Sequence, residues 1–135
     1  MRKSPTDLEI LDAIYERYYD VFTEYSEQNK SRSSKVYVPI DVKEVARALG
    51  VDPDIVFGRL YYDLEGKHGY KQDDGSFVHF FALKVGADLH CVHFPYLGSV
   101  LASLRDENGK YRIATWMSGI SLFVSVVSLL ISIFL

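Results

Sequence analysis

Apolar residues recur in the first part of the chain at the three- and four-residue intervals of an amphipathic helix. The residues on this face are Leu8, Leu11, Tyr15, Tyr18, Phe22 and Tyr25. Ser4 and Pro5 supply a helix start, because serine is a preferred N-cap and proline is tolerated at the first helical position. The pattern predicts a helix from Ser4 to about Gln28, with an acidic outer face, followed by a flexible polar loop over residues 29–34.

The next region predicts two shorter helices after an extended segment. Residues 36–40 form that segment, ended near Pro39. Asp41 then caps a second helix, which Gly50 ends because glycine is favoured just past a helix terminus. A third helix begins at Pro53 or Asp54 and includes residues 54–70.

Alternating apolar residues further along predict a β-hairpin, with strands over residues 77–85 and 89–94 and a turn at residues 86–88. Pairing around this turn sets three pairs opposite each other: Val85 with Leu89, Leu83 with Cys91, and Phe81 with His93. Both faces of the hairpin are largely apolar, so we expect both to be covered. The helices cover one face, and a short helix predicted over residues 96–107, or a second subunit, covers the other.

Charge is distributed unevenly and changes the interpretation of the C-terminal part. All 15 Lys and Arg and all 18 Asp and Glu lie at or before Arg112, whereas residues 116–135 read WMSGISLFVSVVSLLISIFL. Such a helix is roughly 30 Å long, as thick as a bilayer's hydrocarbon core. Trp116 at the interface and the basic residues Lys110 and Arg112 outside it predict a tail anchor whose N-terminal side is cytoplasmic. A buried core helix is the alternative.

The predicted organisation is therefore a cytoplasmic domain over residues 1–107, a juxtamembrane linker that begins with a break at Asn108-Gly109 and covers residues 108–115, and a single transmembrane helix over residues 116–135, in an inner (cytoplasmic) membrane. Serines within that helix follow a 3-4-3-4 spacing on one face: Ser118, Ser121, Ser125, Ser128 and Ser132. Small hydroxyl residues allow close helix approach and interhelical hydrogen bonds. The stripe predicts self-association into a homo-oligomer. Bonding of each serine to its own helix, or the lining of a pore, are the alternatives.

The order of helix, short strand, helix, turn, helix and two-stranded wing over residues 4–95 resembles a winged helix-turn-helix domain. Residues 42–60 carry the resemblance, with Ala46 at the helix contact, Gly50 at the turn, and core positions at Val51, Val56 and Leu60. The resemblance implies an α+β fold, with a head of three helices plus a β-hairpin wing, here followed by a short helix and the transmembrane helix. It also implies a bacterial or phage-like source, and a third helix that enters the DNA major groove.

Charge disfavours the DNA-binding role that the resemblance implies. The net charge is −3, and Asp52, Asp54, Asp63 and Glu65 accompany the third helix, whereas phosphate binding needs clustered positive charge. Four residues of this helix form the predicted surface for a partner protein or nucleic acid: Arg59, Tyr61, Tyr62 and Lys67. Paired tyrosines beside an arginine are typical of a protein-binding hot spot, although we expect at least one of them to be core.

The predicted hairpin holds the candidate catalytic and metal-binding residues His79, His90, Cys91 and His93. Strand alternation separates His90 from Cys91 and His93, so these side chains do not converge on one metal. Cys91 is the only cysteine, which excludes an internal disulfide and is typical of a reducing compartment. The sequence predicts no enzyme, no metal and no cofactor.

The expected function is that of a tail-anchored membrane protein whose head binds a partner protein and whose serine-striped helix self-associates. Two alternatives stay open. One is an effector that permeabilises a membrane under the control of its head, and the other is a membrane-tethered DNA-binding regulator.

Overall fold

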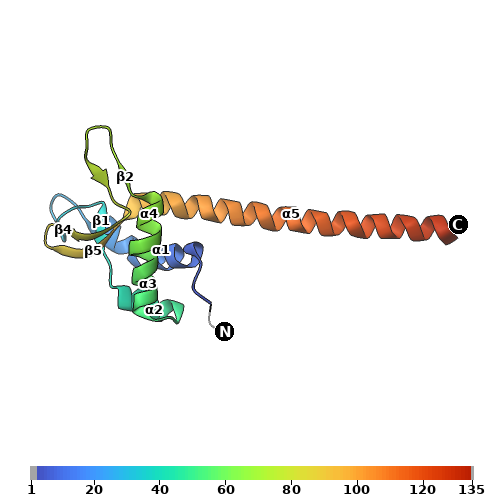
Figure 1. The fold of residues 1–135 in the computed structure, drawn as a ribbon, viewed down its shortest axis with the longest axis horizontal. Helices are drawn as coiled ribbons and strands as arrows, with labels where there is room; N and C mark the ends of the chain where they lie inside the picture. Colours follow the sequence, from blue (N-terminus) through green and yellow to red (C-terminus); the bar gives the residue numbers. More distant parts are fainter. Residues whose placement is uncertain (1–2, 135) are drawn as a thin grey trace. The chain divides into compact units, whose positions relative to one another are not determined.

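The computed structural model describes residues 3–134, and the side chains of residues 110–119, 121 and 134 lie outside that description. Within the described residues the fold is mixed α/β, with five α-helices and two small sheets (Figure 1). The chain divides into two compact units, Met1–Leu101 and Ala102–Leu135.

Helix α1 covers Asp7–Glu24 and begins two residues later than predicted. Thr6, not Ser4, is the N-cap: its hydroxyl accepts from the Glu9 backbone N–H, and the Glu9 carboxylate accepts from the Thr6 backbone N–H. This reciprocal pair is a capping box, which satisfies two donors that a helix start leaves unpaired. The buried residues of α1 are Ile10, Leu11 and Ile14, and the aromatic rings of Tyr15 and Phe22 stack on Phe94.

The segment over residues 29–34, predicted as a flexible loop, contains a buried arginine. The guanidinium of Arg32 donates to four backbone carbonyls, those of Val21, Phe22, Ser34 and Lys35. The central carbon of this guanidinium, Cζ, lies 4.9 Å from the ring centroid of Tyr25. Carbonyls near a helix C-terminus lack partners within the helix, so Arg32 satisfies the end of α1 and ties the following segment to it.

Helix α2 has the predicted caps, and helix α3 begins at Pro53, one of the two predicted first residues. Helix α2 covers Val42–Leu49, with Asp41 accepting from the Lys43 N–H at its start and Gly50 in the left-handed region at its end (φ 69°). Helix α3 covers Pro53–Gly58 and continues into the π-helical segment η1, Arg59–Leu64, and then helix α4, Glu65–His68. These three pieces form one continuous green column in Figure 1.

The strand predicted over residues 77–85 is divided between two sheets. Strand β3 (Phe77–Val78) pairs with β2 (Tyr70–Lys71), an element that the pattern did not predict. Strand β4 (Phe81–Val85) pairs with β5 (Asp88–His93), and β5 also pairs with β1 (Tyr37–Pro39). The three-stranded sheet therefore has the order β1-β5-β4, with β4 at one edge.

The hairpin register differs by one residue from the prediction. Phe81 lies opposite Val92 and Ala82 opposite Cys91, because the turn has two central residues and not three. Gly86 takes the first of these positions with φ 59°, a conformation that glycine adopts without steric cost. His90 has φ 52°, and the Leu83–His90 pair is missing from the ladder. At the other end of the hairpin both faces are buried, as expected for an apolar hairpin.

The core of the first unit joins the helices to one end of the sheet. Its largest fully buried side chains are Phe80, Phe81, Ile10, Leu11, Ile14, Leu60, Leu64, Leu97, Leu101, Val38, Val45 and Val56. Phe80 and Phe81 are adjacent in the chain and both buried, so the start of β4 lies between two packed layers.

The C-terminal part corrects the predicted break, anchor and fold class. Helix α5 covers Phe94–Phe134 without a break, so Asn108, Gly109 and the predicted linker over residues 108–115 are helical. Within the described residues, no helix is long and apolar enough to cross a membrane. The predicted transmembrane helix, the tail anchor and the inner-membrane location with a cytoplasmic N-terminus are therefore wrong, and with them the predicted fold class.

Candidate functional site

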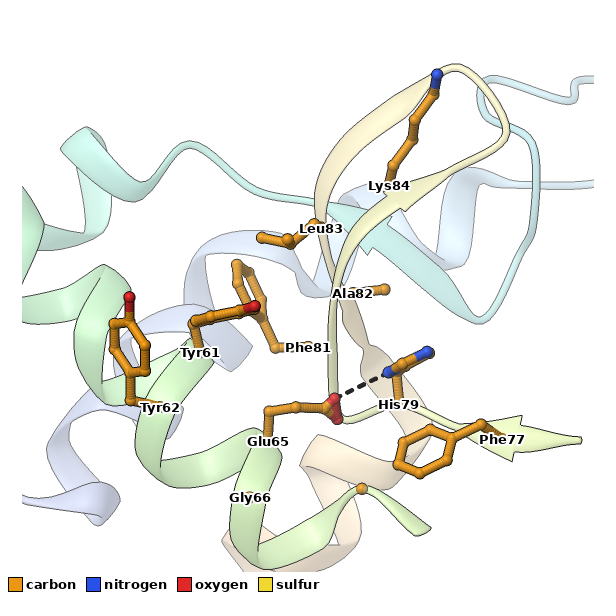
Figure 2. A pocket seen from close by; sticks show the side chains of 11 residues that line it. Tyr61, Tyr62, Glu65, Gly66, Phe77, His79, Phe81, Ala82, Leu83 and Lys84 are labelled. Atoms are coloured by element: carbon orange, nitrogen blue, oxygen red, sulfur yellow. Dashed lines mark hydrogen bonds and ion pairs between the residues drawn. The ribbon is translucent and has the colours of Figure 1, made fainter. Parts of the chain in front are cut away.

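The candidate site is an open groove of about 790 Å³ between the helical column and the edge strand β4 (Figure 2). Aromatic and aliphatic side chains dominate its walls, with one carboxylate, one histidine and one lysine among them. The lining residues are Tyr61, Tyr62, Glu65, Gly66, Gly69, Phe77, His79, Phe81, Ala82, Leu83 and Lys84. We call this feature the aromatic groove.

Tyr61 and Tyr62 form the helical wall of the groove and come from the π-helical segment η1. The backbone N–H of Glu65 donates to the carbonyl of Leu60, five residues back, which is the π-helical pattern. Tyr61 is 38% exposed and Tyr62 77% exposed, and their ring centroids lie 4.9 Å apart in an edge contact. Neither tyrosine is core, contrary to the expectation that at least one would be.

The strand wall comes from β4 and the residues before it. Figure 2 shows Leu83 pointing from the strand toward Tyr61, with the Phe81 ring between helix and strand. Phe81 is buried, whereas Leu83 is 44% exposed and Phe77 is 49% exposed. Exposed apolar side chains that converge on one concave surface are typical of a binding site.

Glu65 closes one end of the groove and ties its two walls together. Its Oε1 accepts from the Phe80 backbone N–H at 2.8 Å, and its Oε2 lies 3.0 Å from Nδ1 of His79. The His79 backbone N–H donates to the hydroxyl oxygen of Tyr37. Burial, followed by the negative charge of Glu65, raises the pKa of Tyr37, so its hydroxyl stays neutral and available to this network.

Arg59 and Lys67 do not line the groove, so the predicted partner surface is split in two. The Arg59 guanidinium pairs with Asp7 and with Asp63, and it also donates to the Ser4 hydroxyl and the Pro5 carbonyl. Lys67 Nζ lies 2.9 Å from Asp7 and 3.2 Å from Asp63. Hydrogen bonds to these two carboxylates raise the pKa of Lys67. This cluster fastens the start of α1 to the helical column.

The residues considered for metal binding lie in different surroundings. Among the described residues, no group of three His, Cys, Asp or Glu side chains is placed to hold a metal ion. Cys91 is buried, and desolvation raises the pKa of its thiol to about 11, so it is not an activated nucleophile. His93 accepts from the Tyr96 backbone N–H at the start of α5, and burial lowers its pKa.

Of the predicted serine stripe, Ser118 and Ser121 lie outside the described side chains. Ser125, Ser128 and Ser132 are exposed on α5. Neighbouring apolar residues of the same helix are exposed as well. They are Ile120, Leu122, Phe123, Val124, Val126, Val127, Leu129, Leu130, Ile131 and Ile133.

Sequence patterns identified Tyr61 and Tyr62 but missed Glu65, Phe77, His79 and Leu83 as groove residues. Glu65 was interpreted as a surface acid, and Phe77 and Leu83 as ordinary hairpin residues. Gly66 in helix α4 and Gly69 just after it were the available signal, because small residues leave space beside a helix.

Comparison of the chain with protein-family models, with curated proteins and with solved structures finds no match. The resemblance to winged helix-turn-helix domains is thus corrected on two counts: no family model supports it, and the described residues include no membrane-spanning helix. The order of elements over residues 4–95 carries no functional assignment.

Proposed function

We propose that this chain is a non-enzymatic protein-interaction module that captures a segment of a partner protein in the aromatic groove. One observation carries the proposal: the exposed side chains of Tyr62, Phe77 and Leu83 gather on one concave surface. Exposed aromatic residues with well-defined rotamers supply contact area at low entropic cost, and they dominate the energetics of protein interfaces.

The polar groups in and near the groove favour a binding site over a catalytic site. The Glu65 carboxylate already accepts from the Phe80 N–H and pairs with His79, so its two oxygens have structural partners. Cys91 is buried and its thiol stays protonated at neutral pH. Arg59 and Lys67 are engaged by Asp7 and Asp63, which removes the two strongest candidates for contacts with nucleic-acid phosphates.

Selection of random peptides displayed on phage against the full chain tests this proposal. Selected peptides are synthesised, and their affinities are measured by fluorescence anisotropy for wild type and variants. We expect Tyr62→Ala and Leu83→Ala each to weaken binding about tenfold, as removal of an interface hot spot does.

Two matched controls accompany these variants. Ile55→Ala and Leu89→Ala remove apolar side chains that are 45% and 59% exposed but lie outside the groove, and we expect unchanged affinity. If no peptide binds, or if all four substitutions have the same effect, the aromatic groove is not an interaction site.

The exposed apolar residues of α5 support a second proposal, that this helix associates with the same helix of another copy. An α-helix that is apolar all round is normally buried, and a large exposed apolar patch marks an interaction surface. Sedimentation of the full chain tests the proposal. We expect an oligomer that dissociates when Leu122 and Leu129 are replaced by Gln, whereas a monomeric wild type would exclude it.

A further inference from the structure

Among the described residues, strand β4 has an edge without a strand partner beside the groove, and the accessible part of this edge is residues 83–85, because Phe81 and Ala82 are buried. The sheet order is β1-β5-β4, and within the described chain no strand pairs with the other edge of β4. An edge strand presents backbone N–H and C=O groups that a further strand can pair with, and proteins commonly shield such edges.

The lining residues show that the groove runs along this edge. Phe81, Ala82, Leu83 and Lys84 are consecutive in β4, and all four line the groove. Successive side chains of a strand point to opposite faces of the sheet. A groove that reaches all four therefore adjoins the strand's backbone edge as well as the face that carries Phe81 and Leu83.

The opposite wall adjoins open space at one position of helix α4. The helical lining residues Tyr61, Tyr62, Glu65 and Gly66 follow the spacing of one helix face, and Gly69 lines the groove just after the end of α4. A Cβ atom added at Gly66 would meet no other atom within 4 Å, so open space adjoins this part of the helix.

Charge further restricts the occupant. Lys84 is exposed and no ion pair of its ammonium group is found among the described side chains. Figure 2 shows Lys84 at the opposite end of the groove from His79. An acidic side chain of a ligand at this end would meet an uncompensated positive charge.

We infer that the occupant is an extended segment of a partner protein that adds to the sheet as a strand alongside β4. This inference rests on the proposed function and specifies its binding mode. Backbone hydrogen bonds to β4 supply affinity, and alternate side chains of the segment supply specificity. Apolar side chains of the segment contact Tyr61, Phe81 and Leu83, and an acidic residue pairs with Lys84.

Backbone methylation of a bound peptide tests the strand mode directly. Each residue of a peptide selected against the full chain is replaced in turn by its N-methyl analogue, which removes one hydrogen-bond donor. We expect losses of about tenfold or more at every second residue and little change at the residues between, because only alternate N–H groups of an added strand face its neighbour.

Two further measurements accompany the methylation series. Hydrogen exchange of residues 81–85 should slow when the peptide binds. Lys84→Glu should weaken binding about threefold, and replacing the peptide's acidic residue by Lys should restore it.

The outcomes separate the binding mode from the proposed function. A two-residue period in the methylation series, with slowed exchange in β4, supports strand addition. Peptides that bind in a Tyr62-dependent way but show no such period, or that bind as helices, overturn strand addition and leave the interaction module intact. Failure of every peptide to bind overturns both.

Discussion

Glu65 and His79 face each other at one end of the aromatic groove, with 3.0 Å between Oε2 of the carboxylate and Nδ1 of the imidazole. The other carboxylate oxygen accepts from the backbone N–H of Phe80. Glu65 belongs to helix α4, whereas His79 and Phe80 separate strands β3 and β4. One side chain of the helical column therefore fixes where β4 begins and holds the sheet edge at its distance from the helix.

Substitution of Gly69 tests this role of Glu65. A Cβ at position 69 would lie 2.5 Å from Oε1 of Glu65 and 2.8 Å from its carbonyl oxygen, so Gly69→Ala forces the carboxylate away from Phe80. The buried Phe80 N–H would lose its partner. We expect the free energy of unfolding to fall by about 2 kcal/mol, measured by urea denaturation.

Gly66→Ala is the matched control for Gly69→Ala. Gly66 lines the groove like Gly69 and lies within helix α4, but its added Cβ would meet nothing within 4 Å. Alanine is favoured over glycine in a helix interior, so we expect a gain of up to about 1 kcal/mol. Equal effects of the two substitutions would contradict the role assigned to Gly69.

Arg32 is expected to be among the most sensitive residues for stability. Arg32→Met retains much of the apolar stem but leaves four backbone carbonyls without their donor. We expect a loss of about 3 kcal/mol in chemical denaturation, because buried acceptors without partners are costly. Arg47→Met is the control: Arg47 is exposed and, among the described side chains, pairs only with Glu44, so its loss should cost less than about 0.5 kcal/mol. Similar losses for both would show that Arg32 is not the tie of this segment.

Arg59 is expected to affect stability and not binding. Arg59→Gln removes the pairs with Asp7 and Asp63, and we expect a loss of about 1–2 kcal/mol. Affinity for peptides in the groove should stay at the wild-type value. The control Arg17→Gln breaks a more exposed pair with Glu44 and should cost less than about 0.5 kcal/mol. If Arg59→Gln left stability unchanged but weakened peptide binding, Arg59 would contact the partner and would not have the structural role assigned to it.

His93 is expected to make stability depend on pH. Burial lowers the pKa of His93 below its ordinary value of 6.5, and its Nδ1 accepts from the Tyr96 N–H only while that nitrogen is unprotonated. The unfolded chain thus binds a proton more readily than the folded chain. The stabilisation is complete above pH 6.5 and is lost as the pH falls from there through the folded pKa.

Two substitutions separate the proton from the hydrogen bond at His93. Asparagine keeps an acceptor for the Tyr96 N–H without titrating, so His93→Asn should flatten stability between pH 7 and pH 5. His93→Ala lacks the acceptor and should lose about 1 kcal/mol at neutral pH as well. Denaturation curves across this range measure both, and a wild type of constant stability would exclude the effect.

Local patterns predicted the elements whose determinants lie close together in the sequence. The caps of α2, Asp41 and Gly50, act on residues within one turn, so their residue types were sufficient. The periodicity of α1 gave the helix but not its start, because Ser4 and Thr6 are both good caps. Only Thr6 is followed by a glutamate three residues on that returns the hydrogen bond.

The groove could be predicted only in part, because its walls are far apart in the chain. Tyr61 and Tyr62 were recognisable as an aromatic pair. The residues opposite them in the groove come from two separate sheets, Phe77 from strand β3 and Leu83 from strand β4. His79 and Phe80 interrupt the predicted strand because both bond to the Glu65 carboxylate. The alternation of residues along the strand does not reveal this contact. Arg59 and Lys67 belong to the same helical column as the tyrosines. Their structural role depends on their ion pairs with Asp7, which is distant in the sequence.

Local sequence patterns were sufficient for the first three helices, the caps of α2 and the existence of an apolar hairpin, since these follow from periodicity and from hydrogen bonds within a few residues. Tertiary structure alone decided the one-residue register of β4 and β5, the burial of Arg32 and the groove beside a free sheet edge. The reason is that these features depend on residues that are far apart in the sequence or on the conformation of one turn. Arg32 and Glu65 find backbone partners on another element only once the chain has folded, and the register follows from the two-residue turn that Gly86 allows.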